Sequence, residues 1–131
     1  MMAESRSQNV LTRRRLLAVL ACLALAVHLF GLYWPGSPDD SGISFPGADK
    51  IAHFLLFAAP VWLLGRLTGR VWLIAVIFAV HGVVSELVQY WYLPHRSGDP
   101  LDLLADLIGI TVATVLLLVQ HRRDSRSSVT P

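Results

Sequence analysis

The stretch at residues 85–109, SELVQYWYLPHRSGDPLDLLADLIG, decides the fold because it places charged side chains between two long apolar runs. Residues 71–85 before it and residues 108–119 after it contain no fully charged side chain. Charge beside such runs is costly in a membrane unless it serves a purpose. We therefore expect a polar site between two membrane helices. The charged residues of the stretch are Glu86, Arg96, Asp99, Asp102 and Asp106.

The composition of the whole chain points to the same class. The chain has 131 residues, of which 54% are hydrophobic and 15% are charged. Soluble domains carry about 25% charged residues, and a soluble core of this length could not hide so much apolar surface. The formal net charge is only +2, and we expect no nucleic-acid partner. The single cysteine, Cys22, excludes a disulfide within the chain.

The pattern of apolar runs predicts an all-α fold, a four-helix polytopic membrane bundle with helices at residues 16–34, 49–65, 71–93 and 101–120. Pro60 should kink or locally unwind the second helix. Residues 1–15 and 121–131 are the predicted tails, and residues 1–12 should be mobile. A cleaved signal peptide or a twin-arginine signal are rival interpretations of the first run, but both expect a soluble domain to follow.

The basic residues predict how the bundle lies in the membrane. Four crossings put both termini on one side, and nine of the arginines fall on that side. Only Lys50 and Arg96 fall on the other side. An excess of basic residues marks the cytoplasmic side of a membrane protein. We therefore expect cytoplasmic tails and outward-facing loops at residues 35–50 and 94–100.

The polar residues of the last three helices should meet near the outer face. Residues three or four apart lie on one side of a helix, which applies to Asp49 with His53, to Glu86 with Gln89, and to Asp102 with Asp106. For terminal charges such as Asp49 and Lys50, solvation at the membrane interface is a sufficient explanation. It does not account for Glu86 or Asp106, which lie more than a turn inside apolar helices.

This arrangement suggests roles for the polar residues. Glu86, Asp102 and Asp106 are the candidate catalytic acids and bases, and His53 is the candidate proton shuttle. Lys50 and Arg96 would hold a phosphate or carboxylate, and Asp49 and Gln89 complete the predicted ligand-binding set. We give two other histidines a structural interpretation: His28 is alone on the first helix, and His81 is expected to be packed and hydrogen-bonded.

Several other chemistries lack their motifs. No cluster of Cys and His has zinc-binding spacing, and residues 82–86 do not form the Gly-x-Ser-x-Gly turn of serine hydrolases. The acidic set could hold a divalent cation through its oxygens, but we assign neither a metal nor a cofactor. Ala105, Gly109 and Ala113 form a stripe of small residues that would let a neighbouring helix approach closely.

The motifs carry a family resemblance when they are read in order. Residues 49–54 read DKIAHF, residues 86–89 read ELVQ, Arg96 follows, and residues 102–109 read DLLADLIG. This set resembles the VanZ-like family, whose pattern is D-K-x-x-H-F, E-x-x-Q, R and D-x-x-x-N-x-x-G. Asp106 departs from it, because the family usually has asparagine there. The resemblance covers residues 45–118 and implies a small multi-helix membrane protein, found in Gram-positive envelopes among others, without a settled reaction.

The leading functional hypothesis is a protein of the bacterial cytoplasmic membrane whose outer face binds or modifies an envelope lipid or cell-wall precursor. Membrane lipids and a lipid-linked or anionic envelope ligand are the expected partners. The family is named for a teicoplanin-resistance protein, so altered glycopeptide sensitivity is an expectation. The alternative is a non-catalytic module in which the same residues form an internal ion-pair network and the protein serves a partner complex. A proton-coupled carrier fits less well, because carriers place polar groups near the membrane midplane.

Overall fold

A computed structural model describes residues 2–35, 46–94 and 98–127 of the protein. It contains four helices: α1 (Met2–Tyr33), α2 (Ala48–Thr68), α3 (Val71–Tyr92) and α4 (Pro100–Ser127). There is no strand in the described ranges. Each helix includes a segment long and apolar enough to cross a membrane, with mean hydropathy between 1.5 and 2.4. The protein is therefore an all-helical, multi-pass membrane protein, as the composition predicts.

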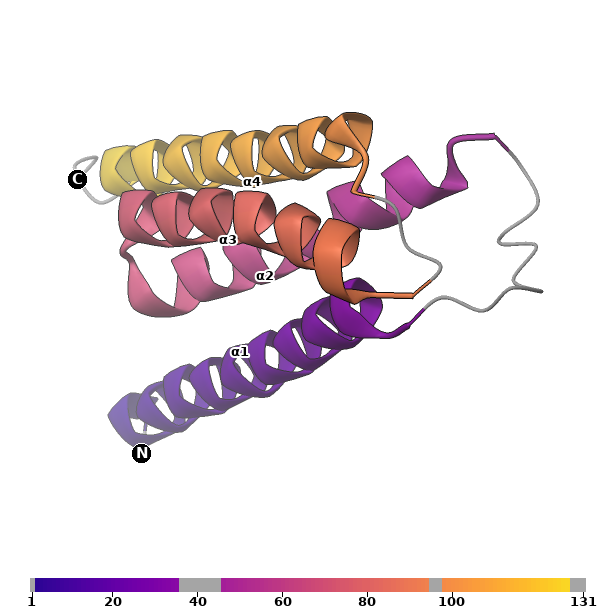
Figure 1. Ribbon diagram of the computed structural model, residues 1–131. Helices are drawn as coiled ribbons and strands as arrows, with labels where there is room; N and C mark the ends of the chain where they lie inside the picture. The colour runs from indigo at the N-terminus through magenta and orange to yellow at the C-terminus, as the bar shows by residue number, and fades with distance from the viewer. Residues whose placement is uncertain (1, 36–45, 95–97, 128–131) are drawn as a thin grey trace.

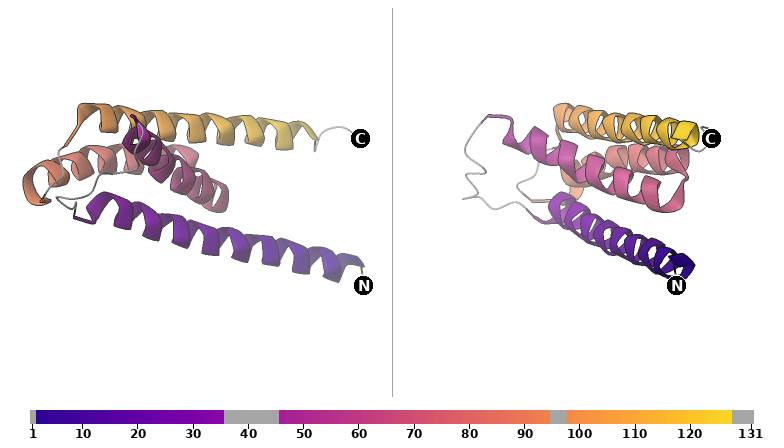
Figure 2. Two further views of the ribbon diagram at one scale, coloured as in Figure 1. Left: turned by 90° about the vertical axis from the view of Figure 1, so that its right-hand side faces the viewer. Right: turned by 180° about the vertical axis from the view of Figure 1, so that it is seen from behind.

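Successive helices run in opposite directions along the bundle (Figure 1). The start of α1 and the end of α4 lie at one end of the bundle in all three views (Figures 1 and 2). Only Gly69 and Arg70 separate α2 from α3. Gly69 adopts a left-handed conformation with φ of 70° and donates its N–H to the carbonyl oxygen of Gly65, 2.9 Å away. This C-terminal cap ends α2 and turns the chain back on itself.

Two helices extend beyond the predicted membrane-spanning runs. Residues 2–12 are part of α1, and α4 continues past residue 120 to Ser127. The predicted mobility of the N-terminal residues stays a prediction. Neither extension contains glycine or proline. Such residues continue a helix that is already formed, because adding one residue costs much less than starting a new helix. Pro60 does not interrupt α2, which is one continuous helix from Ala48 to Thr68.

The close pairing of α2 and α4 organises the bundle. An ideal Cβ placed on Gly109 would lie 2.5 Å from the carbonyl oxygen of Phe54, so only glycine permits this approach of the two backbones. Ala105 and Ala113, on the same stripe of α4, are also buried. In a membrane, helices associate through close packing and hydrogen bonds, because lipid tails are as apolar as leucine. The predicted small-residue stripe is thus the surface of α4 that meets α2.

The apolar residues divide into a small core and a large outer surface. The buried core cluster comprises Leu32, Phe57, Val61, Ala75, Phe78, Ile110 and Ala113. Large side chains such as Trp72, Val80 and Val115 are more than half exposed. An apolar exterior of this kind is compatible with lipid as the surrounding solvent.

Candidate functional site

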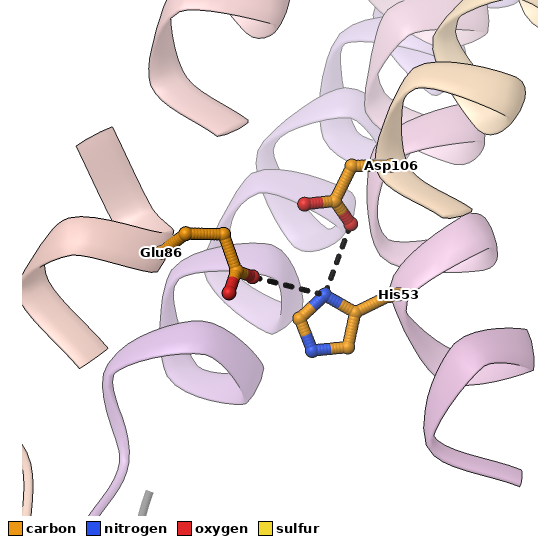
Figure 3. A group of neighbouring side chains, drawn as sticks. All are labelled: His53, Glu86 and Asp106. Atoms are coloured by element: carbon orange, nitrogen blue, oxygen red, sulfur yellow. Dashed lines mark hydrogen bonds and ion pairs between the residues drawn. The ribbon is translucent and has the colours of Figure 1, made fainter. Parts of the chain in front are cut away.

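The predicted polar residues of α2, α3 and α4 come together at one end of the bundle. The antiparallel arrangement brings the first turns of α2 and α4 beside the last turns of α3. His53 from α2, Glu86 from α3 and Asp106 from α4 converge there, as Figure 3 shows. Arg96, which was predicted to hold an anionic ligand, lies outside the described residues.

His53 is the centre of a buried carboxylate–histidine cluster, which we define as His53, Glu86 and Asp106. The Nδ1 atom of His53 lies 3.0 Å from Oδ1 of Asp106 and 3.9 Å from Oε1 of Glu86. Its Nε2 atom lies 3.9 Å from Oδ2 of Asp102. Only the shortest of these contacts is a hydrogen bond. The side chain of Asp106 is completely buried, and those of His53 and Glu86 are nearly so.

In each carboxylate of the cluster, one oxygen accepts a hydrogen bond from a described residue and the other does not. Oε2 of Glu86 accepts the backbone N–H of Asp99 at 2.9 Å, and Oδ1 of Asp106 is bound to His53. Within residues 2–35, 46–94 and 98–127, Oε1 of Glu86 and Oδ2 of Asp106 have no hydrogen-bond partner, although both are buried. A buried acceptor without a partner costs about 1–3 kcal/mol, and more when it is charged. These two oxygens therefore make the cluster, as it stands, unfavourable to bury.

Lys50 lies beside the cluster but belongs to a different set of contacts. Its ammonium donates to Asp49 at 2.8 Å, to Asp102 at 3.0 Å and to Asp99 at 3.2 Å. These three carboxylates surround the positive charge. The predicted role of Lys50 in holding an anion stays a prediction, and the observed contacts do not favour it.

Asp99 has a structural role that was not predicted from the sequence. Its Oδ1 accepts the backbone N–H of Leu101 at 2.9 Å, and its carbonyl accepts the N–H of Asp102, so it caps the start of α4. The Leu101 N–H, followed by the Lys50 ammonium, holds the pKa of Asp99 below its usual range. The sequence pair Asp99-Pro100 could have indicated this cap, because proline is favoured at the position directly after a helix cap.

Gln89 links α3 to the end of α1. Its Nε2 donates to the carbonyl of Leu32 at 3.0 Å, and the side chain is almost fully buried. Gln89 also reaches the lining of the groove described below. This contact gives it a packing function, and its predicted ligand-binding role stays a prediction.

His28 and His81 form a second polar feature with Tyr33. Nδ1 of His28 lies 2.8 Å from the carbonyl of Leu56, its Nε2 lies 3.0 Å from Nδ1 of His81, and Nε2 of His81 lies 2.9 Å from the Tyr33 hydroxyl. His81 is hydrogen-bonded, as predicted. His28 has no other histidine beside it on α1, as noted from the sequence, and its hydrogen-bond partners lie 28 and 53 residues away in the chain.

The direction of each hydrogen bond in this series follows from the acceptor at one end. The Leu56 carbonyl can only accept, so Nδ1 of His28 carries the proton and donates. In the neutral ring Nε2 must then accept, so Nδ1 of His81 donates to it. The remaining Nε2 of His81 accepts the Tyr33 O–H. This neutral chain of hydrogen bonds ties α1 to α2 and α3.

A groove between α1 and α2 reaches this end of the bundle. Its volume is about 800 Å³. Asp49, His53, Gln89 and Asp102 provide its polar lining. Apolar residues line the rest, among them Ala24, Val27, Leu56 and Pro60. Small-molecule sites in proteins have this volume and this combination of an apolar wall with a few polar groups.

Comparisons with known proteins give one distant similarity. The chain is 29% identical over 117 residues to an uncharacterised protein of Schizosaccharomyces pombe, in an alignment that covers 85% of this chain and 67% of the relative. No family model matches the chain, and no solved structure matches it. The VanZ-like resemblance therefore rests on the motifs alone.

Proposed function

We propose that the protein binds a membrane lipid in the groove between α1 and α2, with the polar part of the lipid beside His53, at the polar end of the groove. The distribution of the groove's lining supports this most directly. Polar side chains line it at the start of α2 and at the adjoining parts of α3 and α4, whereas the lining farther along α2 is apolar. A ligand that fits such a groove has one polar end and an apolar chain.

The length of the groove supports a lipid from a single leaflet. Along α2 the lining extends from Asp49 to Pro60, which is about 16 Å at the helical rise of 1.5 Å per residue. The hydrocarbon core of a bilayer is about 30 Å thick, so the groove spans about half of it. An acyl chain of one leaflet matches this span, with its headgroup at the level of His53.

The distribution of basic residues supports an outward-facing site. The end of the bundle opposite the cluster carries Arg13, Arg66, Arg70 and Arg122, and the excess of basic residues is expected on the cytoplasmic side. We place both termini on that side. The sequence similarity extends to a fungal protein, so a general membrane lipid is a better candidate than a precursor found in one type of cell wall. A bacterial envelope precursor is the narrower form of the proposal, with glycopeptide sensitivity as its cellular readout.

Replacing either of two α1 alanines with phenylalanine tests the groove. Ala24 lines the groove, and Ala26, two residues away, is exposed and does not line it. Ala24→Phe should fill the groove and weaken lipid retention about ten-fold, whereas Ala26→Phe should leave it nearly unchanged. Native mass spectrometry would count phosphatidylglycerol and phosphatidylethanolamine molecules retained by each variant. Equal retention by the two variants would contradict the proposal.

The buried contact between His53 and Asp106 favours a second candidate function, a non-catalytic membrane module held together by ion pairs. Removing one partner of a buried pair costs about 3–5 kcal/mol. If the cluster is mainly a scaffold, Glu86→Gln and His53→Ala should each unfold the protein in detergent and lose the cellular phenotype only with the protein. If it is a ligand site, both variants should remain folded while the envelope-lipid profile of the complemented deletion strain changes.

A further inference from the structure

The carboxylate–histidine cluster brings two buried carboxyl groups together with a single imidazole. When Glu86 and Asp106 are both ionised they carry two negative charges, of which His53 can balance at most one. Among the described residues at this end of the bundle, Lys50 is the one permanent cation, and three other carboxylates already surround it. A charge this far inside a membrane protein requires a partner.

The positions of the atoms show where such a partner would lie. His53, Glu86 and Asp106 each offer one ligand atom, and these atoms lie within 4.8 Å of one another. The two carboxylates face the same nitrogen of His53 from different helices (Figure 3). Oε1 of Glu86 and Oδ2 of Asp106 have no hydrogen-bond partner in the described part of the chain. These two buried acceptors are the independent sign that a cationic ligand belongs here.

We propose that His53, Glu86 and Asp106 bind a divalent transition-metal ion. Zinc accepts imidazole nitrogen and carboxylate oxygen ligands, and sites with three protein ligands leave a fourth position for water or substrate. The imidazole favours such a metal over magnesium or calcium, which prefer oxygen ligands. The ion would replace the His53–Asp106 hydrogen bond with bonds from both side chains to the metal.

The surroundings of the cluster suit this assignment. A metal-binding histidine typically donates its second ring N–H to a carboxylate, which fixes the orientation of the ring. Asp102 lies 3.9 Å from Nε2 of His53 and needs only a small movement to accept that proton. The backbone N–H of Asp99 holds Oε2 of Glu86, which leaves Oε1 for the ion. His53 also lines the groove, so the fourth position of the ion would be close to a ligand bound there.

Zinc binding to the whole protein tests the proposal directly. Tag-free, full-length protein in detergent would be stripped with a chelator, titrated with ZnCl₂, desalted and measured by elemental mass spectrometry. We expect one zinc per chain and a thermal midpoint raised by on the order of 8 °C at a hundred-fold excess over Kd. Protein that retains no zinc and is not stabilised by it would overturn the proposal.

Matched carboxylate variants show whether the ion is bound at this cluster. Glu86→Gln and Asp106→Asn preserve side-chain shape and should weaken zinc binding by at least about ten-fold. Asp124→Asn removes an exposed carboxylate from the opposite end of the bundle and should change binding less than about two-fold. Equal affinity in all three variants would place the metal elsewhere and reject the site. Bound Co²⁺ gives a second readout, because its visible spectrum should differ between the wild type and Glu86→Gln.

The Arg96→Ala variant distinguishes two candidates for the group that balances the charge of the cluster, a metal ion and the arginine side chain. If the ion balances the cluster, this variant should bind zinc as tightly as the wild type. If only the variant binds zinc, then Arg96 occupies the role of the ion and the proposal is wrong. The metal proposal does not require a lipid ligand, and Ala24 is not a metal ligand. The groove experiment and the zinc experiment can therefore fail independently.

Discussion

Replacing Gly109 with alanine tests the packing that brings α4 to α2. The added Cβ would lie 2.5 Å from the carbonyl oxygen of Phe54 and 3.3 Å from the backbone nitrogen of Ala58. A carbon and a carbonyl oxygen ordinarily approach to about 3.3 Å, so the helices would have to separate locally by about 0.8 Å. Both obstructing atoms belong to the backbone of α2 and cannot rotate away.

The matched control is Gly82→Ala on α3. Gly82 is also a buried glycine within a helix, but its added Cβ would meet its nearest neighbour, Cδ1 of Leu103, at 3.5 Å, an ordinary contact. Both substitutions gain up to about 1 kcal/mol from the better helix propensity of alanine, so this gain cancels in the comparison. Overpacking costs about 1–3 kcal/mol, which remains as the difference between the two variants.

Thermal unfolding in detergent, followed by circular dichroism, measures this difference. A gap of about 2 kcal/mol corresponds to roughly 6 °C for a chain of this size, with Gly109→Ala the less stable variant. Asp106 lies one turn before Gly109, so the same change should also displace a member of the carboxylate–histidine cluster. If Gly109→Ala is as stable as Gly82→Ala, the close approach of α2 and α4 does not depend on glycine, and the reasoning fails.

Two further predictions concern the polar contacts that join the helices. Tyr33→Phe keeps the ring but removes the hydroxyl that donates to His81, so unfolding in detergent should require about 1 kcal/mol less; an unchanged midpoint would show that the hydrogen bond contributes nothing. Asp99→Asn can still cap α4 and so isolates the effect of the charge. Because the folded-state pKa of Asp99 is depressed, its ionised form stabilises the fold above the unfolded pKa of about 4, and this contribution is lost as the pH falls through the folded value. The difference in thermal midpoint between the wild type and Asp99→Asn should therefore be present near about pH 6 and shrink below about pH 4, whereas a difference independent of pH would contradict it.

The sequence was sufficient for features that depend on local pattern and chain length. Uncharged runs of about twenty residues predict membrane-crossing helices, and short connections make neighbouring helices antiparallel. These two facts are enough to bring His53, Glu86 and Asp106 to one end of the bundle. The small-residue stripe around Gly109 was also visible, although the helix that it faces was not.

The extent of α1 and α4 was harder to predict because hydropathy marks the part of a helix inside the membrane and not where the helix stops. The polar residues at positions 2–12 and 121–127 continue the helices without contributing to an apolar run. Helix propensity favours continuation through such residues when neither glycine nor proline intervenes.

Only the tertiary structure decided which polar groups meet. His53 is bound to Asp106 and not to Asp49, although Asp49 lies on the same face of the same helix. The contact between His28 and His81 joins residues 53 positions apart. Such pairings depend on the rotation of each helix about its own axis and on the distance between helices. Both are set by packing, as at Gly109, where a single missing Cβ lets α4 approach the backbone of α2.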